Sequence, residues 1–487
     1  MNHAARVRTA RCLLLALAPI LRTATAAASE PDPIPARIAG AALTGGGALA
    51  FLEKLTTTVG GRVTGSPECR AASELILAAL KDAGFTNAHF EEYPLESRWT
   101  RGPAAGRIVS PIERKLAIGS YGWVPGTAGA VDAPLVDAGS PSSSTADLPI
   151  PAAALRGAAV LVDPQKAGED PSFVMRASLA RRLAAAGAAA MIIPSDKPNR
   201  MIYTSAFGFF PRGPLPILSV AKEDSLLLRR LLAKGPVRLA LDIRNTFEPG
   251  AYRERNVVAD LPGAAQPDEV VLLGAHFDSW DPAEGANDDG SGVAAILEAA
   301  RILKSLGVKP RRTIRFAFFS GEEEGDLGSR AYVAAHANEL DRLRAVLIMD
   351  DGAQAPRGFD IQGRRDLEAA LKKLLAPLGP LGASRVSLDA SFDKDHGPFV
   401  AAGVPALTLA VDVGEYDTHH HAISDTFDKV DPRMLAIDTA VMAIAAYAIA
   451  DAPAPPGRRL SPSEAAELMK KTGVDSTRRM IEEPANR

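Results

Sequence analysis

The sequence contains very little cysteine. Among its 487 residues only Cys12 and Cys69 are cysteines, and Cys12 lies in an apolar N-terminal run that we expect to be removed. A mature chain with one cysteine cannot form an intrachain disulfide. This excludes a disulfide-stapled scaffold, so stability must come from packing or from bound metal. We expect Cys69 to be a small buried residue near the start of a helix.

The chain also lacks a strong charge of one sign. Its formal net charge is −3, with 23% charged and 47% hydrophobic residues, a composition typical of soluble globular proteins. Nothing in this balance points to nucleic acid or to an anionic membrane as a partner. The length allows two or three domains with a sizeable core.

The N-terminal apolar run is too short to cross a membrane. It covers CLLLALAPIL from Cys12 to Leu21, whereas a spanning helix needs roughly 20 apolar residues. Arg6, Arg8 and Arg11 precede the run, and three alanines ending at Ala28 follow it. We therefore predict a signal peptide and a periplasmic or secreted protein, with a frayed apolar N-terminus as the alternative.

From Arg255 onward, strands alternate with helices. The apolar runs EVVLLGA, TIRFAFFSG and RAVLIM have the length of buried strands, and SGVAAILEAARILKSLG has apolar residues at helical spacing. This alternation predicts an α/β layered fold with a mostly parallel sheet. Further upstream, residues 52–84 read as helix, polar turn and helix, and the strand-like AHFEEYPLE follows. No cluster of titratable residues marks a site there.

Each of the three strands runs into acidic or imidazole side chains. EVVLLGA leads to His276 and Asp278, TIRFAFFSG leads to Glu322, Glu323 and Glu324, and RAVLIM leads to Asp350 and Asp351. In open α/β sheets these strand ends converge on one crevice. Carboxylates crowded there would repel one another unless cations compensate them. Imidazole and carboxylate ligands together suit zinc.

Five short segments of the chain follow one another in an order that resembles the dinuclear zinc exopeptidases of metallopeptidase family 28. They are HFDSWD, GANDDG, GEEEGDLGS, MDD and HAISDT. The resemblance implies a three-layer zinc-exopeptidase fold and two Zn²⁺ per chain. It assigns His276 and Asp350 to one zinc, Glu323 and His421 to the other, and Asp288 to a bridge between them. It also implies that the Asp288–Asp289 peptide bond is cis.

The same resemblance assigns the catalytic roles. Glu322 would be the general base that activates a zinc-bridging water, because it is adjacent to a ligand without being one. Asp278 would accept the second N–H of the His276 imidazole and fix its tautomer. Glu324 departs from the commoner residue of the motif, and we expect it to face solvent.

Several positions stay open. His421 is preferred over His419 and His420 because it stands four residues before Asp425. Asp350 is preferred over Asp351, although a shift by one residue is possible. Asp395 and His396 lie in a segment, DHGPF, that is either a hydrogen-bonded loop pair or a substrate contact.

The predicted organisation contains one inserted domain. One stretch contains a strand that opens with Arg-Gly, then a helix, the residues AGA and a further strand, and it contains no histidine. This order resembles the protease-associated domain of exported peptidases. Such an insert would narrow access to the crevice. The predicted segments are residues 1–28 as signal peptide, 29–124 as the N-terminal part of the peptidase domain, 125–248 as the protease-associated insert, 249–451 as the zinc peptidase domain, and 452–487 as a Pro-rich linker and polar tail.

These features together predict an exported di-zinc exopeptidase that hydrolyses dipeptides or short peptides. Its side-chain preference and the terminus that it reads stay open, as does pairing into a homodimer. One alternative is a single-zinc glutaminyl cyclase-like acyltransferase, which would lack part of the two-metal ligand set. The other is a catalytically inactive receptor-like relative, against which the retention of Glu322 argues.

Overall fold

The computed structural model describes residues 33–144, 146–164, 172–207 and 212–482. The predicted signal peptide, residues 1–28, lies outside the described residues. Residues from Ile34 onward form one compact unit.

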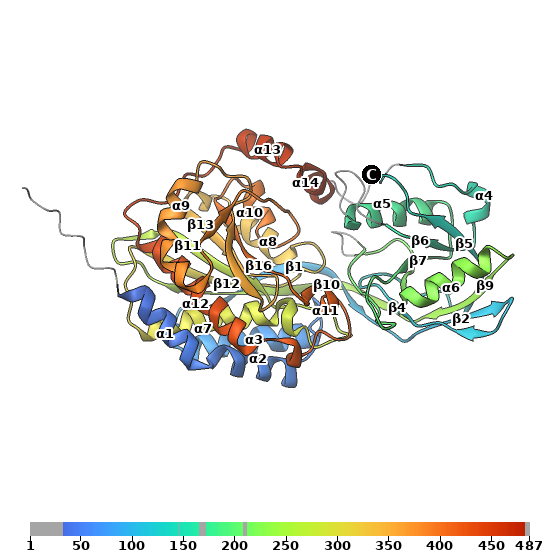
Figure 1. Ribbon diagram of the computed structural model, residues 1–487, viewed down its shortest axis with the longest axis horizontal. Coiled ribbons are helices and arrows are strands. Elements are labelled where there is room, and N and C mark those ends of the chain that lie inside the picture. The colour runs from blue at the N-terminus through green and yellow to red at the C-terminus, as the bar shows by residue number, and fades with distance from the viewer. Residues whose placement is uncertain (1–32, 145, 165–171, 208–211, 483–487) are drawn as a thin grey trace, which may run out of the picture. The chain divides into compact units, whose positions relative to one another are not determined.

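A sheet of eight strands carries the predicted site (Figure 1). Its strand order is β1 (His89–Thr100), β10 (Thr246–Leu261), β12 (Arg312–Phe319), β11 (Gln266–His276), β13 (Leu343–Ile348), β16 (Ala406–Asp412), β14 (Ala355–Asp360) and β15 (Arg385–Ser387). The four central strands, β12, β11, β13 and β16, are parallel to one another, whereas β10 and β14 flank them in antiparallel pairing. The predicted mostly parallel sheet is therefore confirmed.

The central strands are apolar on both faces because helices cover both. In β11, Val271, Leu273 and Ala275 point into one hydrophobic cluster, and Val270 and Leu272 point into another, as the two-residue period of a strand requires. The resulting arrangement of helix, sheet and helix confirms the predicted three layers.

The first helical layer consists of α1 (Ile34–Gly45), α2 (Gly47–Thr58), α3 (Pro67–Asp82), α7 (Ser291–Ser305) and α12 (Pro432–Asp451) (Figure 1). Cys69 is fully buried in the first turn of α3, as predicted. The helix α12 is long and apolar enough to cross a membrane by composition, but most of its side chains pack in the core against α1, α7 and the sheet. The helix is apolar on most of its sides because most of its sides are buried, whereas a helix on the surface has one apolar stripe.

The second helical layer contains α8 (Leu327–Ala335), α10 (Gly397–Ala401) and α13 (Pro462–Lys471). The chain's last described helix, α14 (Asp475–Glu482), follows α13. Within the polar tail, Ala465 and Met469 of α13 are buried, so this helix is anchored by apolar contacts. The short helix α9 (Glu368–Leu374) lies between β14 and β15, and the short helix α11 (Tyr416–His419) follows β16.

A second sheet of eight strands draws on residues 104–243. Its order is β3 (Arg114–Lys115), β2 (Ala104–Ser110), β9 (Arg238–Ile243), β5 (Val131–Gly139), β6 (Ala159–Val162), β7 (Ala190–Pro194), β8 (Ile217–Val220) and β4 (Ile118–Ser120). The helices α4 (Ala152–Leu155), α5 (Ser172–Ala185) and α6 (Lys222–Leu232) belong to the same stretch of chain. The Arg-Gly strand, the helix and the further strand predicted in this stretch are present as β6, α5 and β7.

Candidate metal centre

The polar side chains predicted at the strand ends meet at one edge of the larger sheet. His276 is the last residue of β11, Glu322 and Glu323 follow β12, and Asp350 follows β13. Since β12, β11 and β13 are adjacent and parallel, their carboxyl ends bring these side chains together. His421 reaches the same place from the turn after α11.

The carboxylate of Asp288 lies between two imidazoles. Its Oδ1 is 3.3 Å from Nε2 of His276, and its Oδ2 is 3.1 Å from Nε2 of His421. The backbone N–H groups of Asn287 and Asp288 donate to the carboxylate of Asp425 at 2.8 and 3.2 Å, which fixes the loop. The peptide bond between Asp288 and Asp289 is cis, as predicted.

Each imidazole also faces a second carboxylate. Oδ1 of Asp350 lies 3.4 Å from Nε2 of His276, and Oε2 of Glu323 lies 3.0 Å from Nε2 of His421. The structure therefore brings together all five residues predicted as metal ligands: His276, Asp288, Glu323, Asp350 and His421.

The neighbouring candidates in each motif have other partners. Asp351 forms an ion pair with Lys394. Nδ1 of His419 lies 2.9 Å from Oγ of Ser424. His420 differs, because its ring stacks on that of His421 at 3.9 Å and its Nε2 lies 3.5 Å from Oδ2 of Asp288.

Two groups of side chains could each hold a metal ion. One consists of Asp288, His420 and His421, and the other of His276, Asp289 and Asp350. In the second group, both oxygens of Asp289 already accept backbone N–H groups, from His276 at 3.3 Å and from Gly292 at 2.9 Å. No backbone N–H group of the described residues donates to the carboxylate of Asp288, which belongs to the first group and also faces His276 of the second.

The chemistry of these donors fits zinc. Nε2 of His276, Oδ2 of Asp288 and Oε1 of Glu323 are buried atoms that form no hydrogen bond with any described residue. Buried polar atoms rarely stay unpaired, and converging unpaired nitrogen and carboxylate oxygen atoms are the donors that zinc prefers. The site thus has the composition of a metal centre rather than that of an acidic surface loop.

Asp278 supports the turn that carries the glutamates. Its carboxylate accepts hydrogen bonds from the hydroxyl of Thr64 at 3.0 Å and from the backbone N–H groups of Glu322 and Glu323 at 3.3 Å each. Nδ1 of His276 lies 3.1 Å from the Asp278 backbone carbonyl and 3.6 Å from its carboxylate. The proposed role of this carboxylate in fixing the imidazole tautomer stays a prediction.

Burial and crowding shift the pKa values of the site. Burial raises the pKa of Glu322 well above its ordinary value, and nearby Asp350 raises it further. Burial raises the pKa of Glu323 to about 7. Burial alone would lower the pKa of His421, but the charge of Glu323 and the hydrogen bonds of the ring with Asp288 and Glu323 raise it well above its ordinary value. A cation among these groups would favour the ionised carboxylates and so lower the raised carboxyl pKa values.

Arg62 organises the loop after β11, although it lies 215 positions before Phe277 of that loop. Its fully buried guanidinium donates to the carbonyl oxygens of Phe277 at 2.6 Å, Glu284 at 2.6 Å and Gly285 at 2.8 Å. Gly285 has φ of +60°, and a Cβ atom there would lie 2.3 Å from Oγ of Ser279. The segment around Arg62 is therefore part of the site's support.

Glu324 does not face solvent, so that prediction is wrong. Its side chain is buried beside Asp278 and Glu254, because the turn after β12 packs against the segment that contains Thr64. The pair Asp395 and His396 is also fully buried. Nε2 of His396 contacts the carbonyl of Ser391 at 3.0 Å, which is the arrangement of a hydrogen-bonded loop.

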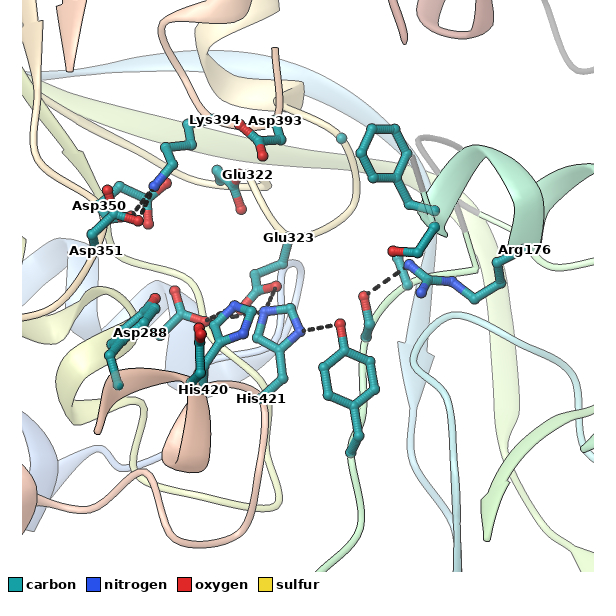
Figure 2. Close-up of a pocket in the computed structure, with 18 residues that line it drawn as sticks. Arg176, Asp288, Glu322, Glu323, Asp350, Asp351, Asp393, Lys394, His420 and His421 are labelled. Carbon is teal, nitrogen blue, oxygen red and sulfur yellow. Dashed lines mark hydrogen bonds and ion pairs between the residues drawn. The ribbon is translucent and has the colours of Figure 1, made fainter. Parts of the chain in front are cut away.

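A cavity of about 330 Å³ opens onto these residues (Figure 2). Its walls include Asp288, Glu322, Glu323 and His421, and also Arg176 and Tyr203 from the stretch that forms the second sheet. The Tyr203 hydroxyl lies 3.2 Å from Nδ1 of His421. A volume of this size is within the range of small-molecule sites.

Comparison with known proteins agrees with the motifs. The sequence model of Peptidase family M28 matches residues 256–447. Carboxypeptidase Q of Rattus norvegicus is 30% identical over 405 residues, which cover 82% of this chain and 84% of that protein. The predicted resemblance to metallopeptidase family 28 is thereby confirmed, and within that family the chain is similar to carboxypeptidase Q.

Two further relatives cover most of the chain. The probable lipoprotein aminopeptidase LpqL of Mycobacterium tuberculosis is 28% identical over 428 residues, covering 79% of this chain and 80% of that protein. The crystal structure of a peptidase M28 precursor from Shewanella amazonensis superposes with a TM-score of 0.79 at 28% identity. It covers 88% of this chain and 98% of its own.

Proposed function

The chain belongs to peptidase family M28, and from this premise we propose that it is an exported di-zinc exopeptidase acting on dipeptides or short peptides. The observation that carries the proposal is the Asp288 carboxylate, whose two oxygens face two different imidazoles, those of His276 and His421. One carboxylate shared between two such donors is the arrangement that a two-metal site needs.

Two zinc ions are the proposed cofactors. His276 and Asp350 would hold one ion, Glu323 and His421 would hold the other, and Asp288 would contact both. When bound, the two ions would polarise the scissile carbonyl and acidify the attacking water. The unpaired buried atoms of His276, Asp288 and Glu323 support this assignment.

Glu322 is the proposed general base. Its carboxylate lines the cavity, and its Oε2 lies 3.9 Å from Nε2 of His276, so it stands beside the ligands without replacing one. The hydrogen bond from its backbone N–H to Asp278 holds the turn in place. Glu322 would take the proton of the attacking water and deliver it to the leaving amine.

The segment 125–248 is proposed to be a protease-associated insert that narrows access to the cavity. Contacts of Tyr203 with His421 and the presence of Arg176 in the cavity wall support this role. The basic and apolar N-terminal sequence supports export through a signal peptide.

A substrate screen combined with metal counting tests the function. Purified protein is assayed with dipeptides and aminoacyl amides, with and without chelator, and its zinc content is measured. We expect two zinc ions per chain and hydrolysis that the chelator abolishes. One zinc per chain with cyclisation of N-terminal glutamine and no hydrolysis would instead identify an acyltransferase.

The variant Glu322→Gln separates catalysis from metal binding. We expect it to keep its zinc and to lose several orders of magnitude in kcat, because the amide cannot accept the proton. Glu339→Gln, at an exposed glutamate, is the matched control and should leave kcat unchanged. Undiminished turnover in Glu322→Gln would remove Glu322 from the mechanism.

A further inference from the structure

The C-terminal tail of the chain is docked at defined points onto the end of α10. Nε of Arg459 donates to the carbonyl of Ala402 at 2.7 Å, and the N–H of Leu460 donates to the carbonyl of Gly403 at 2.8 Å. Gly403 has φ of +79°, and a Cβ atom there would lie 2.3 Å from the Leu460 carbonyl oxygen, so a glycine is needed for this close approach. A capping box then begins α13. The tail therefore leaves α10 in a fixed direction.

The helix α13 packs against α10. Met469 of α13 is 2% exposed and belongs to the same apolar cluster as Phe399 and Val400 of α10. The turn directly before α10 supplies Asp393 and Lys394 to the wall of the cavity. The tail thus contacts the helix that follows one part of the cavity wall.

The next helix, α14, contacts α5 (Figure 1). Val474, which precedes α14, belongs to the same apolar cluster as Val174 of α5. Thr477 of α14 is 3% exposed. Since α5 also carries Phe173 and Arg176, which line the cavity, the tail contacts a second element of the cavity wall.

We infer that this C-terminal strap, residues 458–482, sets the width of the cavity and thereby limits the length of the peptides that bind there. Figure 2 shows Asp393 and Lys394 on one side of the cavity and Arg176 on the other, and the strap contacts the helix next to each side. The inference rests on the proposed peptidase function and narrows its substrate class to very short peptides. The cavity volume of about 330 Å³ is at the small end of the range for ligand sites.

The contact between α14 and α5 is the part of the strap that can be opened selectively. The helix α14 has eight residues, and helices this short depend on tertiary contacts rather than on their own stability. In contrast, α13 is held at its base by the hydrogen bonds of Arg459 and Leu460. A substitution in α14 should therefore release α5 while α13 stays in place.

The first test displaces α14 in the zinc-loaded protein. Thr477→Arg places a large charged side chain where the present one is almost fully buried, so α14 cannot keep its contacts. The value of kcat/KM is measured for dialanine and for tetraalanine, which carry the same charges and differ in length. We expect the ratio of tetraalanine to dialanine to rise roughly 10-fold or more, a discrimination that pocket shape commonly provides. An unchanged ratio, including an equal fall for both peptides, would overturn the inference.

Two further variants control for the added charge. Glu467→Arg adds the same side chain at an exposed position of α13, and its ratio should equal that of the unmodified protein. Thr477→Glu adds the opposite charge and should raise the ratio as Thr477→Arg does, because displacement of α14 is the cause. Opposite changes in the two Thr477 variants would mean that charge acts on the peptides, which would overturn the inference.

Hydrogen exchange tests the contact of the strap without catalysis. In both Thr477 variants the backbone amides of α5 (Ser172–Ala185) should exchange faster, because that helix has lost a neighbour. In Glu467→Arg they should exchange as in the unmodified protein. Unchanged exchange in α5 of the Thr477 variants would show that the strap does not hold this helix, and the inference would be wrong.

Failure of the inference and failure of the proposed function give different results. Calorimetry measures binding of both peptides to the Glu322→Gln protein, with and without Thr477→Arg, and needs no hydrolysis. If peptides are hydrolysed but the length ratio does not depend on Thr477, the peptidase function stands and the role of the strap is lost. If binding shows a length ratio that depends on Thr477 but no peptide is hydrolysed, the role of the strap stands and the peptidase function is lost. Absence of binding by either peptide would overturn both.

Discussion

The hydroxyl of Tyr203 lies 3.2 Å from Nδ1 of His421, although the two residues are 218 positions apart in the chain. The contact is reinforced by backbone pairing, since the N–H of Thr204 donates to the carbonyl of His421 at 2.8 Å. His421 itself has φ of +57°, an uncommon conformation for a residue with a side chain. The stretch of chain that forms the second sheet therefore helps to hold a predicted zinc ligand.

Tyr203→Phe should weaken zinc binding. When Nε2 of His421 binds metal, Nδ1 carries the proton and donates to the Tyr203 oxygen, which fixes the tautomer and the ring. Loss of such a supporting contact lowers metal affinity by roughly 10- to 100-fold. Titration of the metal-free protein with zinc against a competing chelator measures this.

Tyr252→Phe is the control for the loss of a hydroxyl. Tyr252 lies under the guanidinium of Arg98, in a cluster that does not include His421. Its variant should bind zinc as the unmodified protein does. Equal affinities for Tyr203→Phe and the unmodified protein would mean that other contacts suffice to orient His421.

The three consecutive histidines should separate by function. His421→Ala removes an imidazole that faces two carboxylates within 3.1 Å, and zinc affinity should fall by more than the roughly 10- to 100-fold of a supporting contact. His419→Ala removes a contact with Ser424 and should leave zinc binding unchanged. Zinc content after dialysis distinguishes the two variants, and the reverse result would show that the ligand register is wrong by two residues.

Much of the candidate site could be predicted because its residues follow strands. His276, Glu323 and Asp350 each come at the end of an apolar run, and parallel neighbouring strands end at the same edge of a sheet. Asp288 and His421 lie in loops, and only the resemblance of their motifs to a known family placed them. The layered fold could be predicted for the same reason, since buried parallel strands read as continuous apolar runs.

The supporting residues could not be predicted. Arg62, Arg176 and Tyr203 reach the site from segments far away in the sequence, and no periodicity or local motif marks them. Glu324 was expected to face solvent because glutamates in a polar turn usually do. Its burial follows from tertiary packing against Thr64 and Glu254, which the local sequence does not encode.

The pair of His336 and Glu91 should stabilise the fold most in mildly acidic solution. Nε2 of His336 lies 3.1 Å from Oε2 of Glu91. This hydrogen bond raises the pKa of His336. Its contribution to the free energy of unfolding is therefore complete below about pH 6.5 and is lost as the pH rises through the pKa of His336 in the folded protein. Burial opposes the change at Glu91, but the same bond lowers the pKa of Glu91. That contribution is complete above about pH 4.3 and is lost as pH falls further.

Urea unfolding of the unmodified protein and His336→Gln at several pH values checks this. The difference in unfolding free energy should be largest near pH 5.5 and should shrink toward pH 9. Both proteins share the metal site, so loss of zinc affects both alike. Glu91→Gln should give the same pH profile, and a difference that grows with pH would contradict the assignment of the pair.

Arg62→Met should destabilise the protein strongly and should loosen the metal-binding loop. The substitution keeps an apolar stem but leaves the carbonyls of Phe277, Glu284 and Gly285 without their buried donor. Each unpaired buried group costs roughly 1–3 kcal/mol, so we expect the free energy of unfolding to fall by about 3 kcal/mol or more. Arg37→Met, at an exposed arginine, should change it by less than about 0.5 kcal/mol. Urea unfolding of the zinc-loaded proteins measures both values. A small loss of unfolding free energy in Arg62→Met would mean that water replaces the guanidinium. The hydrogen bonds to Asp425 would then be what holds the loop.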